Sequence, residues 1–243
     1  MPRQHSRAAQ TRQTDFGFRE VGEDEKTRLV REVFDHVAGR YDLMNDLMSG
    51  GIHRRWKAEL IDRLKPRPNE ILLDVAGGTG DIARRFLRRA KSGQVIVCDI
   101  NAAMVSAGRD RALDDGILNG ITWLVGDAED LPLADASVDC CTISFGLRNV
   151  TRKERALEEV RRVLKPAGRF FCLEFSQVEA PLLRRLYDLY SFTILPRLGA
   201  VVARDRDAYQ YLVESIRRFP PQAELAAMMG RAGFDQVSWR NLS

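Results

Sequence analysis

The sequence predicts an α/β fold, in which a mostly parallel β-sheet carries helices on both faces. Short apolar runs alternate with longer segments whose apolar side chains recur at helical spacing, an order typical of parallel strands joined by helices. A glycine-rich loop follows the first of these runs, where such folds bind ligands. A chain of 243 residues with 44% hydrophobic content can bury one such core. We therefore expect a single domain over residues 22–243, preceded by a disordered segment over residues 1–21.

The predicted elements follow in chain order. N-terminal helices are expected at residues 23–38 and 54–64, where apolar side chains such as Val33 and Leu60 recur at helical spacing. The predicted strands are residues 71–75, 95–99, 121–125, 138–144, 169–174 and 236–242. The helices predicted between and after these strands are residues 81–90, 102–114, 152–164 and 222–232. A ligand is then expected outside the carboxyl ends of the central strands.

The segment LDVAGGTGD at residues 73–81 is typical of a nucleotide-cofactor loop. Its glycines allow backbone angles and a close approach that a Cβ atom would forbid, and the following helix offers free N–H groups at its start. Because Gly78, Gly80 and Ala83 fit the pattern G-x-G-x-x-A, a nicotinamide-binding Rossmann domain stays open at this point. The candidate cofactor-binding residues of this loop are Gly77, Gly78, Thr79 and Gly80.

Acidic residues at the ends of the next two predicted strands favour a different cofactor. Asp99 follows Gly80 by 19 residues, a spacing that fits a crossover helix and a return strand, and it can accept both ribose hydroxyls of an adenosine. Asp127 and Ala128 follow the next strand, in a loop that can read the amine of adenine. A loop that can hydrogen-bond the adenine amine favours S-adenosylmethionine over NAD as the cofactor. The alternative for Asp99 is a plain helix cap.

Three segments of unusual composition resemble one protein family. They are FDHVAGRYDLMNDLMSGGIHRRWK at residues 34–57, TISFGLRNV at residues 142–150 and YLVESIRRFP at residues 211–220. From about residue 22 onward, the chain resembles the ubiquinone/menaquinone biosynthesis C-methyltransferase family. The resemblance implies a Rossmann-like class I methyltransferase fold and methylation of a ring carbon on a polyprenylated quinol. Ser144, within the second segment, is a further candidate for binding the cofactor.

The chain departs from the family pattern at a few positions. Ala76 stands where the generic loop has its first glycine, and Asp127 replaces a residue that is often Asn. Ala167 replaces a commoner glycine, which disfavours a left-handed turn there. The family normally continues past Leu242 into a Gly-Gly turn and one further strand. Without that neighbour, residues 236–242 are expected to form a poorly paired edge strand or to be disordered.

Methyl transfer to a quinol carbon needs a positioned substrate and a group that helps to remove a phenolic proton. Arg148 could stabilise a phenolate, and Asn149 could orient a water or the hydroxyl. His53 has an ordinary pKa suited to a base, although a single histidine is often structural. The catalytic candidates, which the sequence does not rank, are Tyr41, Asp46, His53, Arg148 and Asn149.

An insertion at residues 182–220 is not required by the minimal fold. Its apolar stripes, such as the one containing Tyr209 and Leu212, are usually core. The sharper hypothesis is that the insertion caps the cleft, lines the path of the isoprenoid tail and presents arginines to anionic lipid headgroups. The arginines concerned are Arg184, Arg185, Arg197 and Arg204.

Composition limits the partners. A net charge of +4 without a concentrated basic stripe does not favour nucleic acid, and no apolar run reaches the ~20 residues of a membrane span. At most, peripheral membrane contact is expected. The four cysteines fall in predicted core strands without metal-ligand spacing, so we expect reduced thiols, no metal and a cytoplasmic location. The arginines of residues 1–19 keep a mitochondrial presequence as the alternative.

The sequence leaves other hypotheses about function open. An NAD-dependent oxidoreductase would bind a dinucleotide, but the chain lacks a Tyr-x-x-x-Lys pair. A non-catalytic scaffold in a quinone-synthesis assembly would bind partners without methyl transfer. A homodimer, and a benzoquinol or a naphthoquinol as substrate, are also undecided.

Overall fold

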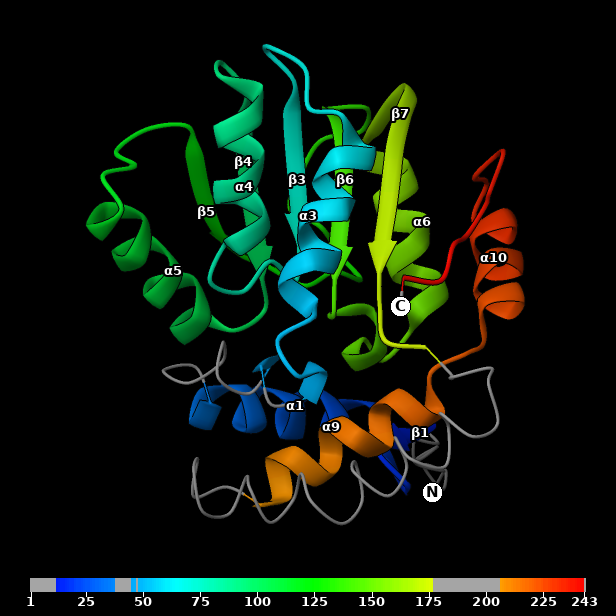
Figure 1. The fold of residues 1–243 in the computed structure, drawn as a ribbon. Helices are drawn as coiled ribbons and strands as arrows, with labels where there is room; N and C mark the ends of the chain where they lie inside the picture. The colour runs from blue at the N-terminus through cyan, green and yellow to red at the C-terminus, as the bar shows by residue number, and fades with distance from the viewer. Residues whose placement is uncertain (1–11, 38–44, 47, 177–205, 243) are drawn as a thin grey trace, which may run out of the picture.

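A computed structural model describes residues 12–37, 45–46, 48–176 and 206–242 of the chain. Its centre is a five-stranded parallel sheet with the strand order β5-β4-β3-β6-β7 (Figure 1). The strands are β3 (Ile71–Val75), β4 (Gln94–Asp99), β5 (Ile121–Val125), β6 (Val138–Ser144) and β7 (Leu164–Leu173). The strand order reverses between β3 and β6, because the chain first adds β4 and β5 on one side of β3 and then returns to the other side. Open α/β sheets bind ligands beside such a switch point.

Helices cover both faces of this sheet. The helices are α3 (His53–Leu64), α4 (Asp81–Ala90), α5 (Ala102–Asp114), α6 (Lys153–Val163) and α10 (Gln222–Arg231). In Figure 1, α3 and α4 lie in front of the sheet and α6 lies behind it. Successive residues of β3 belong to different cores: Leu72 joins the cluster containing α3 and α4, and Leu73 joins the one containing α6. A strand buried on both faces explains why the sequence shows continuous apolar runs.

The predicted strands and helices of the sheet are confirmed, with two differences at β7. β7 begins at Leu164, directly after α6, which is earlier than the predicted 169–174. Ala167 has φ +60°, so the expectation that this alanine avoids a left-handed turn was wrong. Pro166 precedes Ala167, and proline favours a turn whose next residue has positive φ. The proline therefore dictates a geometry that the alanine itself disfavours.

The N-terminal part of the domain differs from the sequence prediction. Residues 13–22 were expected to be mostly disordered, whereas β1 (Gln13–Phe16) and β2 (Arg19–Gly22) form an antiparallel hairpin. Phe16 stacks on Tyr211, with ring centroids 4.2 Å apart, and the N–H of Phe18 donates to the Glu214 carboxylate at 2.9 Å. Contacts with a helix nearly 200 residues away stabilise the hairpin, so its short sequence could not reveal it.

The C-terminal strand predicted at residues 236–242 is absent from the described part of the chain. These residues follow α10 without regular secondary structure, and β7 pairs only with β6 among the described strands. A strand needs a neighbour that completes its hydrogen bonds, and none of the described strands supplies one.

Two further helices lie beyond the carboxyl ends of the strands, α1 (Glu23–Val37) and α9 (Arg206–Arg218) (Figure 1). Within the insertion expected at 182–220, residues 182–205 lie outside the described residues, and so do the four arginines proposed for lipid contact. In α9, Tyr209 and Leu212 are buried in the main core cluster, as the simpler reading of the stripe predicted. None of the described helices is long and apolar enough to cross a membrane.

All four cysteines lie in the sheet region. Cys98, Cys140 and Cys141 are buried, and Cys172 is partly buried. Burial raises the pKa of the Cys98 and Cys140 thiols to about 12. These thiols are protonated at neutral pH.

Candidate cofactor and substrate site

A cleft opens at the carboxyl ends of β3, β4, β5 and β6, beside the switch point. It holds about 780 Å³ of empty space, including the part open to solvent. Its lining combines strand-end loops with one face of α1, and comprises Thr27, Val30, Arg31, Phe34, Ala76, Gly78, Asp99, Ile100, Asn101, Met104, Gly126, Asp127, Ala128, Glu129, Phe145, Gly146, Asn149, Val150 and Thr151. The α1 wall was not predicted from sequence.

Asp99 joins the loops after β3 and β4. One carboxylate oxygen accepts the N–H of Gly78 at 2.8 Å, and the other accepts the N–H of Asn101 at 2.9 Å. Burial raises the pKa of this carboxyl, while the two N–H donors act in the opposite direction. Asp99 is not the cap of α5, because the side chain of Asn101 caps that helix by accepting the N–H of Met104. The cap alternative for Asp99 was therefore wrong.

Three residues of the glycine loop, Gly77, Thr79 and Gly80, determine its conformation but do not line the cleft. Gly80 has φ +71°, and a Cβ atom there would lie 2.6 Å from the ring of Trp123. At Gly77, a Cβ atom would lie 2.8 Å from the Asp74 carboxylate. Thr79 is buried, and its hydroxyl accepts a hydrogen bond from Arg111 at 3.4 Å. Only Gly78 of this loop's four candidates faces the cleft directly.

Asp127 and Ala128 line the cleft as the sequence predicted. One oxygen of Asp127 accepts the N–H of Glu129 at 2.9 Å, which fixes the turn of this loop. Glu129 is buried and pairs with Arg152 at 2.6 Å, and its other oxygen accepts the N–H of Arg152. The loop after β5 is thereby fastened to the start of α6.

The loops after β3 and β6 pack closely against each other at the switch point. Ala76 and Phe145 have φ +49° and +59°, in the left-handed region that costs non-glycine residues about 1 kcal/mol or more. A Cβ atom at Gly146 would lie 2.5 Å from the Cβ of Ala76. Residue 146 must be glycine as long as residue 76 carries a side chain.

Two buried polar atoms near these strand ends have no hydrogen-bond partner. Asp74 in β3 receives the Thr142 hydroxyl on one oxygen at 2.8 Å, while its second oxygen is unpartnered. Burial raises the pKa of Asp74 to about 7. The hydroxyl of Ser144, at the end of β6, is also buried without a partner. Strain, a catalytic role, an ordered water or an ion can each account for such an atom in a native fold. Neither residue is among those that line the cleft. Sequence analysis predicted Ser144 as a cofactor-binding residue but did not single out Asp74 within the loop segment at residues 73–81.

Asn101 also connects the cleft to α1. Its amide nitrogen donates to the Asp35 carboxylate at 2.8 Å and to the carbonyl of Arg31 at 3.3 Å. One side chain therefore caps α5 and holds the α1 wall beside Asp99.

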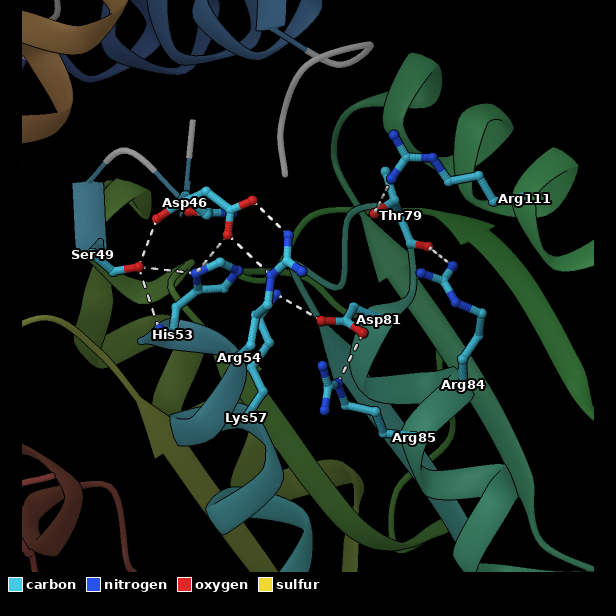
Figure 2. A network of polar contacts seen from close by, with 11 residues as sticks. Asp46, Ser49, His53, Arg54, Lys57, Thr79, Asp81, Arg84, Arg85 and Arg111 are labelled. Carbon is cyan, nitrogen blue, oxygen red and sulfur yellow. Dashed lines mark hydrogen bonds and ion pairs between the residues drawn. The ribbon is translucent and has the colours of Figure 1, made fainter. Parts of the chain in front are cut away.

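Figure 2 shows the polar network around the start of α3. The Ser49 hydroxyl donates to the carbonyl of Asn45 at 2.7 Å, so His53 must donate from Nδ1 in its 2.9 Å contact with Ser49. Burial and Lys57 lower the pKa of His53. His53 is therefore a neutral imidazole with its proton on Nδ1. Asp46 accepts two hydrogen bonds from Arg54, at 3.0 and 2.6 Å, which gives it a structural role.

One turn further along α3, Lys57 reaches the start of α4 (Figure 2). Its ammonium group lies 2.9 Å from the Asp81 carboxylate and 5.9 Å from the centre of the Phe145 ring. Burial alone would raise the pKa of Asp81, but Lys57 and Arg85 outweigh it and lower the pKa to about 2. The pair ties the glycine loop to α3.

Arg148 and Asn149 lie in a short 3-10 helix after β6, but only Asn149 lines the cleft. The Arg148 side chain is fully buried, pairs with Glu174 at 2.8 Å and donates to the carbonyl of Phe145 at 2.6 Å. Asn149 accepts the Tyr211 hydroxyl at 3.0 Å. Of the five catalytic candidates, Tyr41 lies outside the described residues, and Asp46, His53 and Arg148 are not among the cleft-lining residues. No cluster suited to a metal ion occurs among the described residues.

Comparisons with known proteins agree with this geometry. The model of the ubiE/COQ5 methyltransferase family matches residues 20–243. A ubiquinone/menaquinone biosynthesis C-methyltransferase of Paracoccus denitrificans is 57% identical, covering 96% of this chain and 93% of that protein. A mitochondrial 2-methoxy-6-polyprenyl-1,4-benzoquinol methylase of Gallus gallus is 48% identical, covering 95% of this chain and 86% of that protein.

The fold is also found among solved structures. A SAM-dependent methyltransferase from Aquifex aeolicus has a TM-score of 0.53 at 16% identity, covering 73% of this chain and 78% of that one. That likeness concerns the fold, whereas the sequence matches extend over nearly the whole chain. The chain belongs to the ubiE/COQ5 methyltransferase family.

Proposed function

We propose that this chain transfers a methyl group from S-adenosylmethionine to a ring carbon of a polyprenylated quinol, in ubiquinone or menaquinone biosynthesis. The observation that carries the proposal is the family match over residues 20–243. The relatives from Paracoccus denitrificans and Gallus gallus are named for quinone-ring methylation. The cleft at the switch point, with acidic side chains from two strand ends, supports the same activity.

The residues of the cleft fit an adenosyl cofactor. Asp99 has lone pairs left for two ribose hydroxyls, and Asp127 has an oxygen left for the amine of adenine. Asp74 and Ser144, whose unpartnered oxygen atoms lie near the ends of β3 and β6, are not among the cleft-lining residues. When bound, the cofactor supplies an electrophilic methyl group on a sulfonium.

The chain contributes positioning and electrostatics to the reaction. Since Asn149 accepts the Tyr211 hydroxyl on its oxygen, its amide N–H groups are left to donate to a quinol oxygen, where negative charge develops as the phenolic proton leaves. Arg148 acts through position: its ion pair with Glu174 holds the 3-10 helix that presents Asn149. This assignment replaces the direct contact with a phenolate that the sequence suggested for Arg148.

Location and assembly are part of the proposal. We place the enzyme in the cytoplasm, at the inner face of the membrane, where a polyprenylated substrate is available through peripheral contact. A mitochondrial matrix location is the alternative, since the chicken relative is named as mitochondrial. We propose that the protein has no nucleic-acid partner. Light scattering can test whether it forms a homodimer or joins a quinone-synthesis assembly.

The decisive experiment is incubation with isotope-labelled S-adenosylmethionine and either the demethylated benzoquinol or the demethylated naphthoquinol, under reducing conditions. The mass of the product identifies a single added methyl and shows which ring is accepted. The oxidised quinones are the matched control and should give no product, because their ring carbons are not nucleophilic. Absence of labelled product from both quinols would favour the hypothesis of a non-catalytic scaffold. Thermal stabilisation by NADH would favour the hypothesis of an NAD-dependent oxidoreductase.

A further inference from the structure

A second hollow lies beside Arg148 and shares α1 with the cofactor cleft. It holds about 290 Å³ of empty space, including the part open to solvent. The β1–β2 hairpin, α1, α6 and α9 all contribute to its wall. Its lining comprises Asp15, Gly17, Lys26, Arg148, Lys153, Tyr211, Ser215, Arg218 and Phe219.

The walls of this hollow carry more positive than negative charge. Lys26, Lys153 and Arg218 come from three different helices, and Asp15 is the one carboxylate that lines the hollow in the described part of the chain. The fourth cation, Arg148, is balanced by Glu174 at 2.8 Å. Three cations against one carboxylate leave an excess of two positive charges.

The two lysines are held close together without a direct counter-ion. Lys26 is only 2% exposed, and its ammonium group donates to the carbonyl of Val150 at 3.4 Å. Lys153 donates to the same carbonyl at 3.2 Å. Among the described residues, no carboxylate lies within 4.0 Å of either ammonium group. Buried charges are normally paired, so this arrangement is incomplete as it stands.

The titration of the lysines agrees with this geometry. Burial, and then repulsion from Lys153, lower the pKa of Lys26 to about 8, against the weaker attraction of Asp15 and Glu129. Burial also lowers the pKa of Lys153, although Glu174, Asp15, Glu154 and Glu129 raise it. An anion between the two ammonium groups would reverse both effects.

We propose that this hollow binds a tetrahedral dianion, the phosphate group of inorganic phosphate or of a phosphate monoester, between Lys26 and Lys153 with Arg218 at the rim. A dianion matches the two excess positive charges, and three cationic side chains offer charge-assisted hydrogen bonds. The site would tie the N-terminal hairpin, α1 and α9 to the start of α6. Lys26 and Lys153 both donate to the carbonyl of Val150, which lines the cofactor cleft. Phosphate bound between the two lysines would therefore also stabilise the cleft wall at Val150.

Isothermal titration with inorganic phosphate tests the site directly. Lys153→Gln should weaken phosphate binding about tenfold or more, because one of the two central donors is lost. Arg88→Gln, which removes one exposed charge at the end of α4 away from the strand carboxyl ends, should bind as the wild type does. Arg218→Gln is a second variant at an exposed position, so its weaker binding can be measured even if Lys153→Gln does not fold.

Thermal unfolding gives an independent readout. Phosphate should raise the melting temperature of the wild type above that in chloride of equal ionic strength, and this rise should be lost in Lys153→Gln. Equal melting temperatures in phosphate and chloride for the wild type, or equal phosphate affinity for the wild type and both pocket variants, would overturn the proposal.

A pelleting assay separates the two sources of the phosphate group. Vesicles of phosphatidylcholine with phosphatidic acid should retain the wild type, but not Arg218→Gln, if a lipid headgroup is the natural ligand. Binding of free phosphate without retention on these vesicles identifies a soluble ligand of the same site.

Discussion

Ala76 and Gly146 stand opposite each other at the switch point, so close that a Cβ atom on Gly146 would lie 2.5 Å from the Cβ of Ala76. The next nearest atoms to that position, also of residue 76, are 3.7 and 3.8 Å away. The obstacle to a larger residue at 146 is therefore one methyl group.

This relationship predicts a strong coupling between two substitutions. Gly146→Ala should destabilise the protein by about 1–3 kcal/mol, the usual cost of overpacking. Ala76→Gly should stabilise it by about 1 kcal/mol, because φ +49° suits glycine better than alanine. In the double variant the added methyl has room, so the loss should largely disappear. Urea unfolding of all four proteins measures the coupling, and strictly additive effects would contradict the steric explanation.

Asp99→Asn should weaken S-adenosylmethionine binding by about 2–4 kcal/mol, because hydrogen bonds from the ribose to a charged acceptor become bonds to a neutral one or are lost. Asparagine keeps the shape of the side chain and an oxygen for one backbone N–H. Asp110→Asn, at an exposed position on α5, is the matched control. Calorimetry that finds the same affinity in both variants would refute the role of Asp99.

Asp74 should make the protein less stable as the pH rises. Its folded pKa of about 7 lies above the value of 3.8 for an exposed carboxyl, so the unfolded state loses this proton first and stability falls between about pH 4 and 7. Asp74→Asn should be more stable than the wild type by about 4 kcal/mol at pH 8, and the difference should vanish below about pH 4. Urea unfolding across this range is the measurement. A constant difference would show that Asp74 is not protonated in the fold.

Tyr211→Phe should lower kcat several-fold while leaving the affinity for S-adenosylmethionine unchanged. The tyrosine hydroxyl orients the amide of Asn149, and without it the amide is free to rotate. Phenylalanine keeps the stack on Phe16, so the hairpin should stay in place. Turnover and cofactor affinity measured on the same sample separate orientation from misfolding. An unchanged kcat would remove Tyr211 from the positioning of Asn149.

The central sheet could be predicted from sequence because its strands leave apolar runs, which are most continuous in β3 and β6, where the strands are buried. Asp99 and Asp127 were found by the same logic, since parallel strands bring their carboxyl ends to one edge. The β1–β2 hairpin was missed because Phe16 and Tyr211, which stack on each other, are nearly 200 residues apart in sequence.

The roles of individual loop residues were harder to predict. A glycine motif does not reveal which glycine faces the ligand, and Gly80 is explained by Trp123, a residue from another strand. Arg148 was expected at the cleft, but its partner Glu174 follows a different strand. Asp74 was overlooked because burial of its carboxylate depends on α3 and α4, which its own strand does not encode.

Labelling of the cysteines in the sheet can report on local opening of the fold. Their raised thiol pKa values leave almost no thiolate while the fold is closed. An alkylating reagent can therefore modify the buried Cys98, Cys140 and Cys141 only when strands separate. The labelling rate at each of these three cysteines records how often that part of the sheet opens.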